Sequence, residues 1–113
     1  LQETNWGGHA CEEETSSVLG THPELVKMER VPETPARPLG RMSSLPPTYS
    51  AIWWYANYPD HYAGDAHPAT LTKGQTIIRL KADCLAQYIA AVKTDTVVPA
   101  LEEEFFQRAE RLS

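Results

Sequence analysis

The segment from His9 to Ser16 combines side chains that could carry out acid–base chemistry. It reads His-Ala-Cys-Glu-Glu-Glu-Thr-Ser, so that an imidazole precedes a run of carboxylates by a few residues. An imidazole can take up or release a proton near neutral pH, and a nearby carboxylate can hold the orientation of its ring. We therefore take His9 and Glu14 as candidate catalytic residues. The alternative is that the glutamates only match the positive end of a helix dipole.

Cys11 adds a thiol two residues after His9. A cysteine and a histidine can form a nucleophilic pair, but neighbours two positions apart in a loop rarely point at one another, so we do not expect one here. Cys11 and Cys84 lie on segments of different character and have no framework spacing. This favours reduced thiols and a cytoplasmic location over a disulfide.

A second group of potential ligands lies in one polar loop and consists of Asp60, His61, Asp65 and His67. Carboxylates and imidazoles could bind zinc or manganese. The loop lacks the His-x-x-x-His and Cys-x-x-Cys spacings of such sites, and Asp65 and His67 are well placed to cap a helix after Pro68. We favour capping, and we predict no metal ligands in this chain.

Helices are expected to position these groups. Acidic residues before an apolar pair predict a short helix that starts near Glu12, and Pro23 predicts a new helical turn over residues 23–26. A stripe of apolar residues with a seven-residue repeat predicts one long helix and comprises Leu71, Ile78, Ala82, Leu85, Ile89 and Val92. A final helix is expected to begin at Pro99 and to be acidic in its early turns.

The middle of the chain is expected to be extended. Five prolines between Val31 and Pro47 exclude a regular helix or a central strand there. Residues 50–58 are rich in Trp, Tyr and Ile and are predicted as a strand, whose aromatic side chains form core or subunit contacts. A lone strand leaves its backbone donors and acceptors unpaired, so we expect its partner strands to come from polypeptide outside this chain.

Composition limits the possible functions. The chain has 113 residues, a net charge of −5 and scattered Lys and Arg, which excludes the basic stripe of a nucleic-acid-binding domain. No apolar run approaches the roughly 20 residues that span a bilayer. We therefore expect one soluble domain, or part of one, with no nucleic-acid or membrane partner.

The motif His9, Ala10, Glu12, Glu14, Thr15 and Ser16, followed by Pro23-Glu24-Leu25-Val26, resembles the creatininase family. The pattern Gly64-Asp65, Ala69-Thr70 and Lys73-Gly74 is similar to the C-terminal part of the same family. The resemblance implies an α/β fold with a parallel sheet between helices. It also implies that residues 1–113 are a C-terminal fragment of one domain, with residues 1–30 as motif and helix, 31–49 as proline-rich loop, 50–58 as strand and 68–113 as C-terminal helices.

The same resemblance implies a metal-dependent amidohydrolase that cleaves a C–N bond of a small cyclic amide or a formamide. His9 would contact the substrate and move a proton at the reacting nitrogen, Glu14 would support it, and Trp6 lies near the position of an aromatic residue that lines the pocket. Cys11 replaces the usual glycine. The family's pair of divalent ions, zinc, manganese or iron, is bound by residues upstream of the motif, so this chain alone is expected to bind none and to be inactive.

Two functions therefore remain open. In the first, the chain is part of a hydrolase and associates with the remainder of the enzyme, or with a second chain that supplies metal ligands, in a homo-oligomer. In the second, it is a noncatalytic assembly subunit that docks on a partner through its strand and its amphipathic helices.

Overall fold

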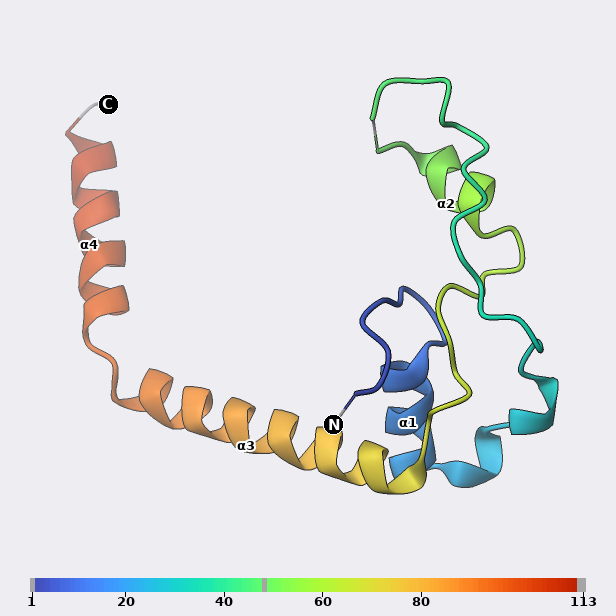
Figure 1. Ribbon diagram of the computed structural model, residues 1–113. Helices are drawn as coiled ribbons and strands as arrows, with labels where there is room; N and C mark the ends of the chain where they lie inside the picture. The colour runs from blue at the N-terminus through green and yellow to red at the C-terminus, as the bar shows by residue number, and fades with distance from the viewer. Residues whose placement is uncertain (1, 48, 112–113) are drawn as a thin grey trace. The chain divides into compact units, whose positions relative to one another are not determined.

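The structure is a computed structural model that describes residues 2–47 and 49–111, and its regular elements are helical (Figure 1). In chain order they are α1 (Glu12–Thr21), the 3-10 turns η1 (Pro23–Leu25) and η2 (Met28–Arg30), α2 (Ala51–Asn57), α3 (Leu71–Thr94) and α4 (Val97–Glu110). The chain divides into unit 1 (Leu1–Arg79) and unit 2 (Leu80–Ser113), and α3 runs through the boundary.

The predicted α/β fold with a parallel sheet is wrong. Across residues 2–47 and 49–111 the backbone forms isolated β-bridges but no β-strand and no sheet. The segment predicted as a strand, residues 50–58, instead forms α2. Because a helix pairs its backbone groups internally, α2 needs no neighbouring strand, and the inference that partner strands are missing loses its premise.

Local contacts explain why α2 is helical despite its aromatic composition. The rings of Trp54 and Tyr58, four residues apart, have centroids separated by 5.0 Å, which is the spacing that a helix brings together. The Asn57 amide donates to the Trp53 carbonyl at 3.0 Å and accepts from the Gly40 backbone N–H at 2.9 Å. Strand propensity describes how a side chain packs on a pleated surface, and the described part of the chain offers no such surface.

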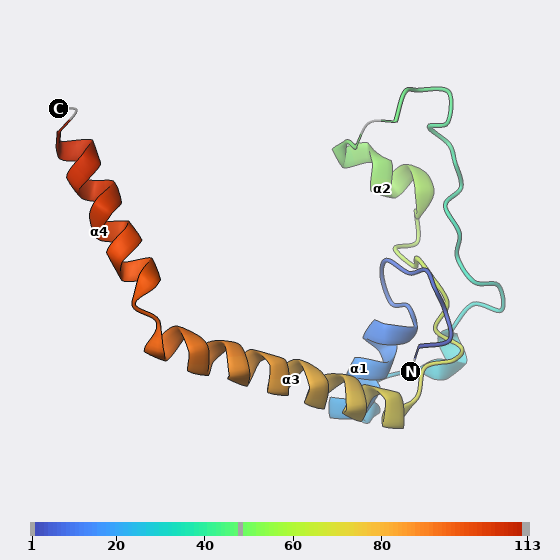
Figure 2. The same ribbon diagram turned by 60° about the vertical axis from the view of Figure 1, so that its left-hand side comes forward.

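Helix α1 and the first turns of α3 meet backbone to backbone in unit 1, as Figures 1 and 2 both show. A Cβ atom on Gly74 would lie 1.7 Å from the carbonyl oxygen of Ser16, and one on Gly20 would lie 2.5 Å from the Gly74 carbonyl carbon. The Ser16 hydroxyl, fully buried, accepts a hydrogen bond from the Thr70 backbone N–H at 3.2 Å. The two glycines thus permit a contact that no side chain could enter.

Two short bridges connect distant segments of unit 1. His9 and Ala63 exchange both backbone hydrogen bonds at 3.0 Å, and Ala36 and Gly64 do the same at 2.9 and 3.0 Å. The proline-rich stretch 31–47 otherwise lacks helix and strand, as its prolines predict. One turn of residues 63–64 therefore fixes both this stretch and the backbone of His9.

Small and polar residues make up the buried part of unit 1. The buried apolar residues are Cys11, Ala56, Ala63, Ala66 and Ala69, and the buried polar ones are Glu12, Ser16 and Asn57. Unit 1 thus buries little apolar area per residue, and its buried hydrogen bonds and ion pairs have to specify much of its structure.

The predicted helices are confirmed, with two adjustments. Helix α4 begins at Val97, two residues before Pro99, because both Asp95 carboxylate oxygens accept backbone hydrogen bonds of its first turn at 3.0 Å. The apolar stripe of α3 is not buried, since Gly74 is the one buried residue among those described in this helix. Within residues 2–47 and 49–111, no helix is both long and apolar enough to cross a membrane.

Candidate functional site

The structure brings the two candidate catalytic residues together at the start of α1. The His9 Nδ1 atom lies 3.3 Å from Glu14 Oε2, and both side chains are about half exposed, at 58% and 51%. The same Glu14 oxygen accepts a hydrogen bond from the backbone N–H of Ala10 at 2.6 Å. One carboxylate therefore contacts both the imidazole and the backbone that carries it.

A left-handed residue shapes the turn between His9 and α1. Ala10 has a φ of 55°, a conformation that a residue with a Cβ atom rarely adopts. Its carbonyl accepts a hydrogen bond from the Thr15 hydroxyl at 3.1 Å, and its N–H donates to Glu14. Together with the bridge to Ala63, these bonds hold the backbone on both sides of the imidazole.

This geometry suits His9 to proton transfer. When Nδ1 donates its proton to Glu14, the lone pair of Nε2 can accept a proton from a substrate or a water molecule. The carboxylate then faces an imidazolium and stabilises its charge, as the orienting group of a general base does. The pair can therefore act as general base and, once protonated, as general acid.

Trp6, predicted to lie near the substrate, contacts an arginine. The guanidinium carbon of Arg37 lies 4.0 Å from the centroid of the Trp6 ring, within the range of a cation–π interaction. Trp6 is half-buried. The sequence did not indicate this contact, because Arg37 belongs to the proline-rich stretch and nothing in its spacing refers to Trp6.

The Cys11 side chain is buried and packs against two glycines. It is 7% exposed, and its side chain lies where a Cβ atom on Gly7 or Gly64 would collide with it, at 2.8 and 2.6 Å. His9, in contrast, is exposed. Cys11 therefore fills space between two glycines, on a residue that directly precedes α1.

Glu12 is the residue of the motif that sequence reasoning understated. It is 1% exposed and lies 2.6 Å from the ammonium group of Lys73, at the start of α3. It also accepts hydrogen bonds from the backbone N–H groups of Glu3 and Thr4 at 3.0 and 2.7 Å, and from the Thr4 hydroxyl at 2.8 Å. Lys73 in turn donates to the Pro68 carbonyl at 2.8 Å and to the Glu3 carboxylate at 2.6 Å.

This network stabilises the ionised carboxylate of Glu12. Burial by itself raises the pKa of the carboxyl group, but the hydrogen bonds from Lys73, Glu3 and Thr4 together outweigh it and lower the pKa from 4.5 to about 2. The carboxylates of Glu12 and Glu3 in turn raise the pKa of Lys73. Glu12 therefore joins the N-terminal segment, α1 and α3, and it supports the turn that presents His9.

The loop of Asp60, His61, Asp65 and His67 does not assemble into one cluster. Asp65 accepts hydrogen bonds from the His67 backbone at 2.9 Å and lies 2.7 Å from the His67 ring, while the His61 ring accepts from Trp54 Nε1 at 3.3 Å. The backbone bond from His67 is the main cause that lowers the pKa of Asp65. Asp65 was predicted to cap the helix after Pro68. Instead, the Thr70 hydroxyl accepts a hydrogen bond from the Lys73 backbone N–H in the first turn of α3 at 3.2 Å.

The described residues do not fit a metal ion. Within residues 2–47 and 49–111, no group of three or more His, Cys, Asp and Glu side chains is arranged to hold one. Zinc in catalytic sites ordinarily has three protein ligands, and a pair of ions needs more. No ligand of the expected metal pair can therefore be assigned to these residues.

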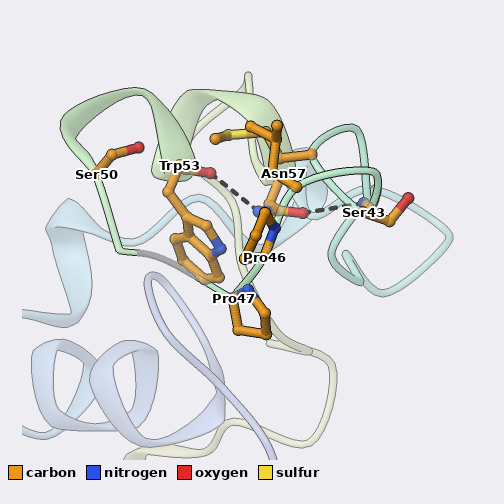
Figure 3. A pocket seen from close by; sticks show the side chains of 9 residues that line it. Ser43, Pro46, Pro47, Ser50, Trp53 and Asn57 are labelled. Carbon is orange, nitrogen blue, oxygen red and sulfur yellow. Dashed lines mark hydrogen bonds between the residues drawn. The ribbon is translucent and has the colours of Figure 1, made fainter.

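A cavity of about 580 Å³ lies beside α2 (Figure 3). Trp53 and Asn57 project from α2 toward the proline-rich stretch, where Pro46 and Pro47 form the opposite wall. Its lining is mainly apolar and includes neither His9 nor Glu14 nor Trp6. Its position thus gives no indication of where a substrate of His9 would bind.

The family model of creatininase, described as creatinine amidohydrolase, matches residues 1–89 of the chain. The chain therefore belongs to the creatininase family, as the motif around His9 indicates, and this membership supports an amidohydrolase-type function. The comparisons with curated proteins and with solved structures found no match.

Proposed function

We propose that the chain supplies the proton-transfer residues of an amidohydrolase that cleaves a C–N bond in a small cyclic amide or a formamide. The observation that carries this proposal is the 3.3 Å contact between His9 Nδ1 and Glu14 Oε2 within a family-matched segment. His9 would protonate the leaving nitrogen as the C–N bond breaks, and Glu14 would hold the imidazole and balance its charge.

The metal dependence of the complete enzyme is part of the same proposal. We expect a pair of divalent ions, zinc, manganese or iron, which would supply Lewis-acid activation of the amide. Because the described residues contain no suitable ligand group, its ligands should come from the remainder of the enzyme or from another chain. The isolated chain is then expected to be inactive, and we expect the complete enzyme to act in the cytoplasm, where thiols such as Cys11 and Cys84 stay reduced.

His9→Gln in the complete enzyme tests the role of the imidazole. We expect kcat for hydrolysis of creatinine or of a formamide to fall by about 10²–10⁴-fold, with the bound metal content unchanged, because a general acid or base contributes about that factor. Glu14→Gln should lower kcat less, since it keeps the shape of the side chain and removes only the charge beside the ring.

His67→Gln is the matched control, because His67 is also an exposed histidine of unit 1 that contacts a carboxylate. It should leave kcat within about twofold of the parent enzyme, which is far less than the loss of a general acid or base. If His9→Gln and His67→Gln give the same kcat, His9 has no part in the chemistry.

A noncatalytic assembly role is the second candidate, and the exposed apolar residues of unit 2 favour it. Purification of the chain with its partners separates the two functions. A stable partner without hydrolase activity, combined with full activity of His9→Gln, would support assembly alone.

A further inference from the structure

The cavity beside α2 has a serine hydroxyl in its lining that forms no hydrogen bond with the rest of the chain. The Ser50 Oγ atom is buried and, among residues 2–47 and 49–111, has no hydrogen-bond partner. Ser50 directly precedes α2, but its side chain does not bond the first turn of this helix. It lines the cavity and points toward the Trp53 side, as Figure 3 shows. A buried hydroxyl without a partner costs free energy, so a polar group that bonds it from within the cavity would be favoured.

Hydrogen bonds hold the two walls of this cavity together. The Asn57 side chain of α2 accepts a hydrogen bond from the Gly40 N–H at 2.9 Å, and its backbone carbonyl accepts one from the Leu39 N–H at 3.2 Å. The Arg41 guanidinium donates to two backbone carbonyls near the end of α2. The proline-rich stretch therefore cannot separate from α2 without breaking several bonds. A site that is formed before its ligand arrives loses less conformational entropy on binding.

The lining of the cavity indicates a neutral ligand with a flat apolar body. Apolar contact comes from Met42, Leu45, Pro46, Pro47 and Trp53, and none of the described residues in the lining is ionisable. A bound ion would therefore lose its hydration without meeting an opposite charge. The indole ring offers a flat face to a planar molecule. The volume of about 580 Å³ also lies within the range of small-molecule sites, which is roughly 300–1,000 Å³.

We propose that this cavity binds a neutral, planar and mainly apolar small molecule against Trp53, Pro46 and Pro47, and that the Ser50 hydroxyl bonds a hydroxyl or carbonyl group of this ligand. The site is independent of the chemistry proposed for His9, because the lining of the cavity includes neither member of the catalytic pair. Unit 1 would thus have a second, noncatalytic ligand site.

Nuclear magnetic resonance of the 113-residue chain with labelled tryptophan tests the site, with 2-naphthol as the probe. The probe is neutral at pH 7, planar, and carries a single hydroxyl group. The indole N–H signal of Trp53 should shift and saturate, whereas that of Trp6, which lies outside the lining, should not move. The anion 2-naphthoate should bind at least about tenfold more weakly, because no cation in the lining compensates its charge.

Ser50→Ala tests the hydroxyl group. It should raise the dissociation constant of 2-naphthol about fivefold, because one hydrogen bond contributes about that factor. It should leave the dissociation constant of 2-methylnaphthalene unchanged, because a methyl group replaces the hydroxyl in this probe. If Ser50 acts only on the stability of α2, the variant changes the affinity for both probes equally.

Leu45→Glu tests the apolar wall with a substitution outside α2. Leu45 lines the cavity and is 56% exposed, and the change should raise the dissociation constant of 2-naphthol at least about fivefold, because it replaces apolar contact with a charge. Leu39→Glu is the matched control, since Leu39 is 58% exposed in the same proline-rich stretch and lies outside this lining. A Trp53 signal that does not saturate, equal dissociation constants for the two glutamate variants, or an equal effect of Ser50→Ala on both probes overturns the proposal.

Discussion

Replacing Glu12 by Gln should destabilise unit 1, because it leaves the ammonium group of Lys73 beside a buried neutral side chain. The lowering of the Glu12 pKa from 4.5 to about 2 corresponds to at most about 3.4 kcal/mol, since each pKa unit equals about 1.36 kcal/mol. The Lys73 side chain is 15% exposed, so that solvent screens part of the interaction, and we expect a loss of about 2 kcal/mol.

The stabilising contribution of Glu12 should decrease as the pH falls. The folded pKa of Glu12 is lower than the unfolded one, so its stabilising contribution is complete above the unfolded value of 4.5 and is lost as the pH falls toward 2. The difference in free energy of unfolding between the parent chain and Glu12→Gln should therefore be largest above pH 5 and shrink between about pH 5 and pH 2.

Urea unfolding followed by tryptophan fluorescence measures this difference, because all three tryptophans, Trp6, Trp53 and Trp54, belong to unit 1. With an m value of about 1 kcal/mol/M, a loss of 2 kcal/mol lowers the urea midpoint by about 2 M at neutral pH. Glu24→Gln, which removes an exposed carboxylate from η1, is the control. Equal midpoints for the two variants, or a Glu12→Gln effect that does not change with pH, would refute the assigned role of this ion pair.

The close packing of unit 1 leads to two further predictions, both measurable by the same urea assay. Gly74→Ala should cost about 3 kcal/mol or more, because its Cβ atom would lie 1.7 Å from the Ser16 carbonyl oxygen, whereas Gln75→Ala, at the next and exposed position, should have little effect. Asn57→Leu should cost about 1–3 kcal/mol, because the buried Asn57 amide then no longer bonds the Gly40 N–H and the Trp53 carbonyl. A loss below about 0.5 kcal/mol, the usual range of a surface change, would contradict this prediction.

Local sequence signals predicted the helices. The acidic residues before Val18 and the seven-residue repeat from Leu71 to Val92 identify α1 and α3, because amphipathic periodicity and helix-dipole preferences act within a few turns. The motif around His9 likewise predicted membership of the creatininase family and the pairing of His9 with Glu14.

The remaining features depend on contacts between distant segments. The aromatic residues of α2 have strand propensity, and beside the local contacts of this helix the hydrogen bond from the Gly40 N–H to Asn57 links it to a segment 17 residues away. In the sequence, Glu12 is one of three consecutive glutamates with similar surroundings. Its ion pair with Lys73, 61 residues later in the chain, distinguishes it from the other two. Sequence could have hinted at this pair, since Lys73 belongs to the family-like pattern and a buried carboxylate needs a cation.

The left-handed conformation of Ala10 has a consequence for any attempt to transplant the His9 motif. A residue with a Cβ atom in this conformation costs about 1–2 kcal/mol, which the bonds to Glu14, Thr15 and the Ala63 segment offset. A synthetic peptide of residues 5–17 lacks Ala63, so its Ala10 should relax to negative φ and the imidazole should drift from the carboxylate. Grafting these thirteen residues onto another scaffold would thus transfer the sequence of the motif but not its backbone conformation.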